Sequence, residues 1–93
     1  MTIYTIRYTS LQNTKDIGKF PKTDLKKIKN AIEQKLTTEP NLFGKPLRRT
    51  LRSYWSLRVG QYRVIYRIQE TEVLIFLIEH RSIVYDMAKR ILE

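Results

Sequence analysis

The alternation of hydrophobic and polar residues changes its period along the chain, and each period predicts a different element. Residues 2–8 (TIYTIRY) alternate with a period of two, which is typical of a β-strand. Residues 10–18 predict a short helix. Residues 22–37 predict a longer amphipathic helix that ends before Pro40, since a proline cannot continue the hydrogen-bonded turn. Its apolar stripe is formed by Leu25, Ile28, Ala31, Ile32 and Leu36.

The second half of the chain returns to the period of a strand. Residues 40–50 contain one glycine and two prolines and are predicted to form a loop. Three strands are predicted after it, over residues 53–59, 62–69 and 72–79. The last of them is a continuous apolar run, so we expect it to be central and covered on both faces. From Ile83 onward the apolar residues recur at helical spacing.

This order of elements predicts one α+β domain that spans residues 1–93. We expect a two-layer domain with a four-stranded, mostly antiparallel sheet, N-terminal helices on one face and a short C-terminal helix. A chain of 93 residues can bury one hydrophobic core but not two independent ones.

Residues 57–66 (LRVGQYRVIY) are predicted to form a hairpin over Gly60 and Gln61. A glycine at the first central position is typical of a type II′ turn. Counting outward from that turn sets Arg58 opposite Arg63, on the face that we expect to be open to solvent. The other face is expected to lie beneath the helices and carries the pairs Val59–Tyr62, Leu57–Val64 and Trp55–Tyr66.

The predicted pairing of two arginines needs an explanation, because like charges directly opposite each other destabilise a strand pair. A bound anion between Arg58 and Arg63 would remove the repulsion. A phosphodiester is such an anion, since it accepts charge-assisted hydrogen bonds from guanidinium groups. The alternative is that Arg58 lies near the tip of the hairpin and extends into water.

The charge distribution also favours an anionic partner. Eighteen Lys and Arg against nine Asp and Glu give a net charge of +9. No acidic residue lies between Glu39 and Glu70, and arginine, which dominates this interval, binds phosphate through two parallel hydrogen bonds. The basic residues of the interval are Lys45, Arg48, Arg49, Arg52, Arg58, Arg63 and Arg67. The alternative reading is that the charge serves solubility alone.

A second candidate cluster is EHRSIVY, residues 79–85, which leads from the last strand into the last helix at an edge of the sheet. His80 is the only histidine, and its ordinary pKa of about 6.5 suits proton transfer. Arg81 follows it. Tyr85 could stack on a base or, with a pKa lowered by arginines, accept a proton. The alternative is that His80 is an ordinary surface or core residue.

Composition excludes several other classes of site. The chain has no cysteine and one histidine, so neither disulfides nor a zinc site is expected. It has no glycine-rich phosphate loop, and we expect no metal and no cofactor. No apolar run approaches the roughly 20 residues of a membrane span, and the N-terminus alternates instead of forming a signal-peptide core. We therefore expect a cytoplasmic protein without a membrane partner.

Two blocks of the sequence resemble the RelE/ParE toxin superfamily and, within it, the RelE-like endoribonucleases. They are W-x-L-R-x-G-x-Y-R-V-I-Y over residues 55–66 and H-R-x-x-V-Y over residues 80–85. The resemblance implies a RelE-like toxin of a type II toxin–antitoxin system. It implies that the toxin enters the ribosomal A site and cleaves mRNA without a metal, by attack of the 2′-hydroxyl on the adjacent phosphate. It also implies a cognate antitoxin, which we expect to be acidic to match the +9 charge.

The same resemblance implies roles for individual residues. Arg63 would hold the scissile phosphate, and Arg81 would assist it or protonate the leaving oxygen. Tyr85 would stack on the substrate base or take part in proton transfer. His80 is the choice for a general base or acid. The remaining basic residues would contact the RNA, namely Arg58, Lys45, Arg48, Arg49 and Arg52.

The sequence departs from the family pattern in two places. Some active members carry lysines where this chain has Trp55, Ser56 and Arg58, and some carry a basic residue where it has Glu79. These departures leave the identity of the general base open. Two alternative functions therefore stay open: that of the ParE branch, which inhibits DNA gyrase without nuclease chemistry, and that of a plain nucleic-acid-binding module.

Overall fold

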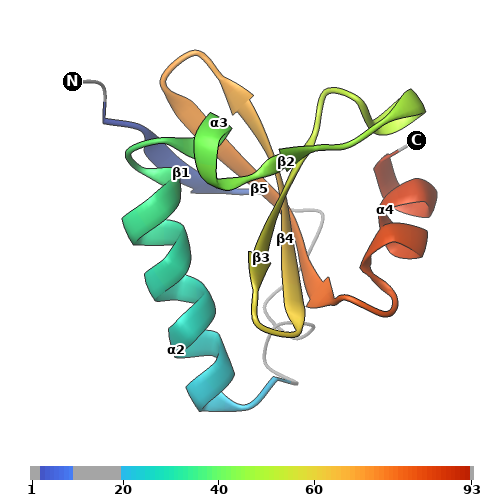
Figure 1. Ribbon diagram of the computed structural model, residues 1–93, viewed down its shortest axis with the longest axis horizontal. Helices are drawn as coiled ribbons and strands as arrows, with labels where there is room; N and C mark the ends of the chain where they lie inside the picture. The colour runs from blue at the N-terminus through green and yellow to red at the C-terminus, as the bar shows by residue number, and fades with distance from the viewer. Residues whose placement is uncertain (1–2, 10–19, 93) are drawn as a thin grey trace.

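The computed structural model describes residues 3–9 and 20–92, which form one mixed β-sheet with helices on both faces (Figure 1). The strand order is β1-β5-β4-β3-β2, with β1 parallel to β5 and every other neighbouring pair antiparallel. The elements are β1 (Thr5–Tyr8), α2 (Lys22–Ala31), η1 (Ile32–Leu36), α3 (Pro40–Phe43), β2 (Lys45–Pro46), η2 (Arg49–Leu51), β3 (Trp55–Val59), β4 (Tyr62–Gln69), β5 (Glu72–His80) and α4 (Val84–Leu92). Within the described residues, no helix is both long and apolar enough to cross a membrane.

The predicted α+β class is confirmed, but the sheet has five strands instead of four. The fifth is β2, whose two residues pair with β3 inside the segment 40–50 that was predicted to be a loop. The same segment also contains α3 and η2, so Pro40 begins a short helix at a position where its missing N–H costs nothing. Strand β1 starts at Thr5, later than predicted. The predicted helix over residues 10–18 lies outside the described residues.

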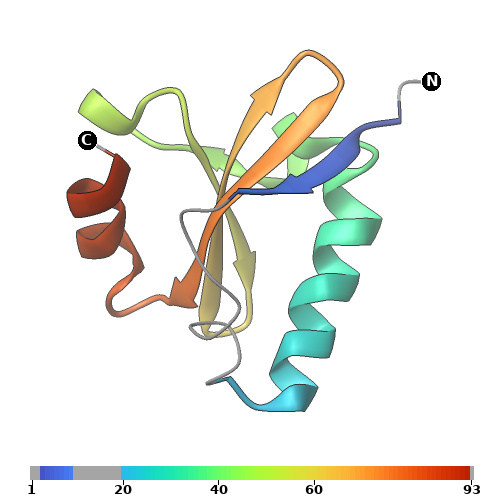
Figure 2. The same cartoon turned by 180° about the vertical axis from the view of Figure 1, so that it is seen from behind.

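The larger hydrophobic core lies between the sheet and the long helix. The apolar stripe of α2 and of its π-helical continuation η1 packs on the strands, as the helical spacing predicted (Figure 2). The face of the β3–β4 hairpin that was predicted to lie under the helices is confirmed as the floor of this core. The buried residues are Phe20, Ile28, Ile32, Leu36, Leu57, Val64, Tyr66, Val73, Ile75 and Ile78.

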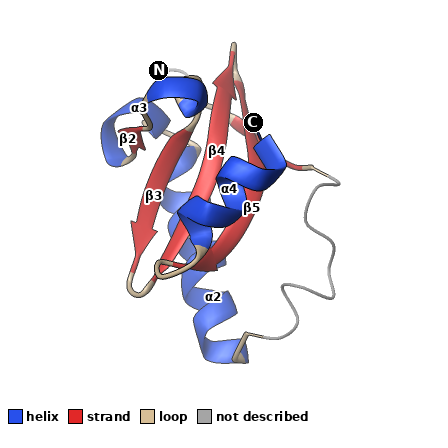
Figure 3. Cartoon of the chain, turned by 90° about the vertical axis from the view of Figure 1, so that its right-hand side faces the viewer, coloured by secondary structure: helices blue, strands red, loops and turns tan. Residues whose placement is uncertain are grey.

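A second, smaller core covers part of the opposite face, so the expectation of an open face is wrong there. Helix α4 runs across that face (Figure 3). It buries Val84 and Ala88 against apolar side chains from the strands and from η2. These partners are Leu51, Ile65 and Leu77. The physical reason is that an amphipathic helix must cover its apolar stripe, and Ile65 and Leu77 form the nearest apolar surface of the sheet.

The register of the β3–β4 hairpin is the one that the sequence predicted. Val59 lies opposite Tyr62 and Arg58 lies opposite Arg63, and the pairing continues outward to Trp55 and Tyr66. Gly60 has φ +58°, a left-handed conformation that glycine adopts without the steric cost of a Cβ atom. The predicted turn therefore places both arginines side by side on the α4 face.

A β-bulge in β5 changes the face on which the end of this strand presents its side chains. Tyr66 pairs with Ile75, whereas the preceding Ile65 pairs with Leu77, so β5 carries one extra residue, Phe76. A bulge shifts the two-residue alternation by one position. As a result Glu79 lies opposite Arg63, and the next residue, His80, falls on the face of α2.

Close packing on Tyr66 ties the α3–β2 segment to the core. The Tyr66 hydroxyl donates a hydrogen bond to the carbonyl of Pro40, and burial raises the pKa of Tyr66 well above its ordinary value. A Cβ atom added at Gly44 would lie 1.7 Å from the Tyr66 hydroxyl oxygen. Since Tyr66 is fully buried and cannot swing away, the segment itself would have to shift.

We therefore expect Gly44→Ala to lower the free energy of unfolding by about 1–3 kcal/mol through overpacking, measured by urea denaturation. The control is Gly60→Ala, where the added methyl meets nothing within 4 Å and only the positive φ costs about 1 kcal/mol. Equal stability of Gly44→Ala and wild type would show that the segment is not held by Tyr66.

Candidate functional site

A groove of about 530 Å³ opens on the α4 face of the sheet, beside the β3–β4 hairpin. Segments distant in sequence meet there, namely the α3–β2 segment, β3, β4 and the first turn of α4. Four of its side chains are basic, and none of the described residues that line it is acidic. The lining residues are Phe43, Lys45, Pro46, Leu47, Arg48, Ser56, Arg58, Arg63 and Tyr85.

Arg63 is the more enclosed of the paired arginines. Its Nη1 atom donates to the carbonyl of Tyr62 at 2.8 Å and to the carbonyl of Gly60 at 3.1 Å. A guanidinium has five N–H donors in a rigid plane, so two bonds to the turn orient the group. Arg58 lies directly across the strand pair and is exposed.

Glu79 lies on the other side of Arg63. It belongs to the candidate cluster of residues 79–85, but the sequence predicted no role for it. Its side chain is only 2% exposed, and its Oε1 atom accepts a hydrogen bond from the backbone N–H of His80 at 3.0 Å. Arg58, Arg63 and Glu79 thus form one row across three strands. An acidic neighbour across the strand pair is favourable for Arg63 and offsets the repulsion from Arg58.

Tyr85 forms one wall of the groove from the first turn of α4. Its hydroxyl lies 3.1 Å from Oγ of Ser56, which is buried in β3 two residues before Arg58. This hydrogen bond fixes the end of the ring, while 39% of the residue stays exposed. An exposed, fixed aromatic ring beside arginines is the arrangement that proteins use to stack nucleic-acid bases.

The remaining predicted RNA contacts fall into two groups. Lys45 and Arg48 line the groove itself. Arg49 lines a second recess of about 510 Å³ that Tyr85 also lines, and Arg52 borders a shallower hollow that also includes Arg49. Sequence reasoning missed Lys89 of α4, which lines the second recess. A signal for it was its position four residues after Tyr85, on the same face of a helix.

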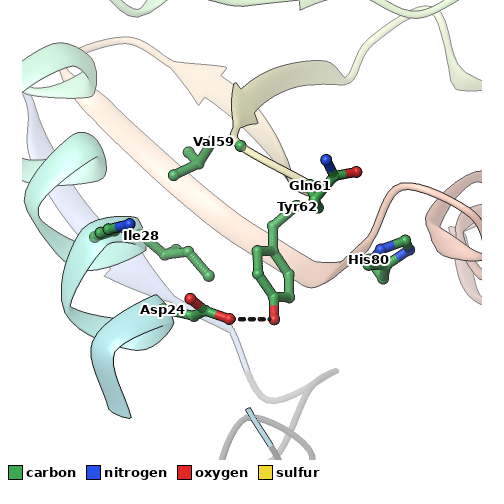
Figure 4. Close-up of a pocket in the computed structure, with 8 residues that line it drawn as sticks. Asp24, Ile28, Val59, Gln61, Tyr62 and His80 are labelled. Atoms are coloured by element: carbon green, nitrogen blue, oxygen red, sulfur yellow. Dashed lines mark hydrogen bonds between the residues drawn. The ribbon is translucent and has the colours of Figure 1, made fainter. Parts of the chain in front are cut away.

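The structure separates His80 from the arginines. Its ring lies on the α2 face, edge-on to Tyr62 at 6.0 Å between ring centroids, in a cavity of about 370 Å³ (Figure 4). Its Nδ1 atom accepts the backbone N–H of Ser82 at 3.1 Å and lies 2.8 Å from the Ser82 hydroxyl oxygen. Tyr62 donates a hydrogen bond to Asp24, which raises the pKa of Tyr62.

Arg81 also lies outside the groove. Its side chain is exposed, and its backbone N–H donates to the carbonyl of Gln61 at 2.8 Å, which ties the end of β5 to the hairpin turn. Among the predicted catalytic residues, the structure therefore brings together Arg63 and Tyr85. In the part of the chain that the structure describes, no group of three or more His, Asp or Glu side chains is placed to hold a metal ion.

Comparison with known proteins gives a family match over most of the chain. Residues 4–85 match the sequence profile of a family described as the ParE toxin of the type II toxin–antitoxin system parDE. Toxin RelG from Mycobacterium tuberculosis is 38% identical over 84 residues, which are 88% of this chain and 95% of that toxin.

Solved structures give the same picture. A chain of the toxin–antitoxin complex RelBE2 from Mycobacterium tuberculosis superposes with a TM-score of 0.79 at 38% identity, over 88% of this chain and 95% of that one. A chain of the RelB–RelE antitoxin–toxin complex from Methanococcus jannaschii has a TM-score of 0.64 at 23% identity, over 86% of this chain and 95% of that one. The second likeness shows a shared fold.

Proposed function

Because the chain belongs to the RelE/ParE superfamily of type II toxin–antitoxin toxins, we propose that it is an endoribonuclease that cleaves mRNA in the ribosomal A site. The observation that carries this proposal is the groove in which Arg58 and Arg63 meet the exposed ring of Tyr85. Two guanidinium groups that line one groove suit a phosphodiester, and an aromatic wall suits the base attached to it.

In the proposed reaction the 2′-hydroxyl oxygen attacks the adjacent phosphorus, and the bond from phosphorus to the 5′-oxygen breaks. The 2′-oxygen loses its proton and the 5′-oxygen gains one, which leaves a cyclic phosphate and a 5′-hydroxyl. Negative charge grows on the non-bridging oxygens as the bond forms. Arg63, already oriented by the carbonyls of Gly60 and Tyr62, is placed to stabilise that charge, and Arg58 adds a second cation.

Tyr85 would position the substrate. The hydrogen bond to Ser56 holds its ring, and a base stacked on that ring would bring the attached ribose and phosphate to the arginines. Holding reacting atoms in line supplies a large part of a rate enhancement without any proton transfer by the protein. His80 lies on the α2 face, away from the groove, so water would carry out the proton transfers. Exposed Arg81 would contact the flanking RNA backbone.

A cognate antitoxin is the second proposed partner. The relatives in the solved complexes RelBE2 and RelB–RelE are paired with antitoxins. The net charge of +9 would speed association with an acidic antitoxin. Binding of the antitoxin would also compete with RNA if it covered the groove.

The gyrase-inhibiting branch remains the second candidate function, because the matching family profile is that of ParE toxins. One paired experiment separates the two. Primer extension on an mRNA in a reconstituted translation reaction, with and without ribosomes, is run beside a gyrase supercoiling assay. We expect cuts that appear only with ribosomes and unaffected supercoiling. Inhibited supercoiling with intact mRNA would replace the ribonuclease by a gyrase poison.

A further inference from the structure

The second recess adjoins the groove. The two cavities share three lining residues, Leu47, Arg48 and Tyr85. The recess is bounded on one side by η2 and on the other by α4, which lie next to each other near the C-terminal end of the chain (Figures 1 and 2). A strand held in the groove can therefore continue past Tyr85 without leaving the protein surface.

The recess has the chemistry of a nucleotide site. Its floor is apolar, from Leu47 and from the buried Leu51. Its rim carries two cations on opposite sides, Arg49 from η2 and Lys89 from α4. A base can lie on the leucines beside Tyr85, while its phosphate lies between the guanidinium and the ammonium group.

The backbone at Arg49 adds an independent observation. Arg49 has φ +59°, a left-handed conformation that a residue with a Cβ atom rarely adopts. The other described non-glycine residue with positive φ is Glu70, which lies in the two-residue turn between β4 and β5 that requires it. Arg49 does not lie in a hairpin turn that would require this conformation. Unfavourable backbone conformations of this kind are often found at ligand sites.

We propose that this recess is a second nucleotide subsite, in which Arg49 and Lys89 bind the phosphate of the nucleotide next to the one stacked on Tyr85. The inference rests on the proposed function, since it takes single-stranded RNA as the ligand. The substrate is then a run of RNA that continues from the groove past Tyr85 into the recess, and binding in the recess adds affinity to binding in the groove.

The first test measures binding of RNA that cannot be cleaved because the scissile nucleotide lacks its 2′-hydroxyl. A dinucleotide that ends at the nucleotide expected to stack on Tyr85 is compared, by fluorescence anisotropy at low salt, with a hexanucleotide that continues beyond it. We expect Lys89→Gln to weaken the hexanucleotide about fivefold and to leave the dinucleotide within about twofold. The matched control is Arg90→Gln, which removes the same charge from the neighbouring exposed position outside the recess. Equal behaviour of the two variants overturns the subsite.

The second test uses the strained backbone. Arg49→Gly removes the cation and also relieves the left-handed conformation, so we expect about fivefold weaker hexanucleotide binding with no fall in the midpoint of thermal unfolding. The control is Glu70→Gly, which has the same backbone conformation at φ +57° but lies in the β4–β5 turn, and which should keep hexanucleotide affinity. Unchanged binding by Arg49→Gly overturns the proposal.

Arg63→Ala separates failure of this inference from failure of the proposed function. If Arg63→Ala weakens both RNAs but Lys89→Gln matches Arg90→Gln, the groove stands and the second subsite is wrong. If Lys89→Gln weakens the hexanucleotide while Arg63→Ala binds both RNAs like wild type, the recess binds RNA and the assignment of the groove is wrong. Absence of hexanucleotide binding by the wild-type protein overturns the subsite as well.

Discussion

Replacement of Arg63 by alanine is expected to reduce the rate of mRNA cleavage by about 10²–10³-fold, the usual effect of removing one group that stabilises charge in the transition state. The guanidinium is already oriented by the carbonyls of Gly60 and Tyr62, so little reorganisation is needed when the phosphate arrives. The same change leaves buried Glu79 without its cationic neighbour, and we expect a loss of about 1 kcal/mol in the free energy of unfolding. Single-turnover cleavage and urea denaturation measure the two effects separately.

Arg63→Lys distinguishes charge from geometry. It keeps a cation opposite Glu79, and we expect its stability to be close to that of the wild type. A lysine cannot form two parallel hydrogen bonds to a phosphate, so cleavage should still fall by about 10-fold or more. The control is Arg67→Ala, an exposed arginine of the same strand that does not line the groove, which should stay within about twofold. Wild-type cleavage by Arg63→Lys would show that charge alone is enough.

The second large effect is expected at Ile65. This residue is fully buried in the small core under α4, so Ile65→Ala should lower the free energy of unfolding by about 2–5 kcal/mol. The small core is also what holds α4 on the sheet, and α4 carries Tyr85. We therefore expect loss of cleavage even under conditions in which most of the protein is still folded.

Leu57→Ala is the matched control, because it creates a cavity of similar origin in the larger core on the other face. We expect comparable destabilisation, measured by urea denaturation, but cleavage in proportion to the folded fraction. If cleavage by Ile65→Ala, like that by Leu57→Ala, falls only in proportion to the folded fraction, the small core is not what holds α4 on the sheet.

The hairpin was the part of the fold that the sequence predicted best. Every pair from Val59–Tyr62 to Trp55–Tyr66 is confirmed, because strict alternation and a glycine turn leave only one register that buries the apolar face. β5 was predicted to be central and is an interior strand, the second of five between β1 and β4, because an apolar run without alternation needs cover on both faces. These predictions depend on local pattern alone.

The position of His80 could not be predicted in this way. Regular alternation from the β4–β5 turn would set Ile78 opposite Arg63 and would bring His80 onto the groove face. The bulge at Phe76 reverses this, and it is invisible in the sequence because Phe76 and its neighbours on both sides are all apolar. A one-residue change of phase thus removed the histidine from the candidate site and placed Glu79 there.

The cover over the second face was also beyond a reading of local pattern. The apolar stripe of α4 was visible, with Val84 and Ala88 at helical spacing, but a stripe does not state which surface it will cover. Ile65 on the face expected to be open was the available signal. The walls of the groove from α3 and β2 are set by packing of Gly44 on Tyr66, which depends on the finished fold.

The pairing of β1 with β5 has a consequence for the synthesis of the protein. Thr5 pairs with Glu72, so β1 cannot join the sheet until β5, which is translated much later, is available. β5 supports both β1 and β4, and Tyr85 follows it, so the nascent chain has no complete sheet and no groove until most of it has left the ribosome. Contacts between such distant residues fold slowly, because the long intervening loop must close first. A nascent chain of this topology cannot form the groove before β5 and Tyr85 have left the ribosome.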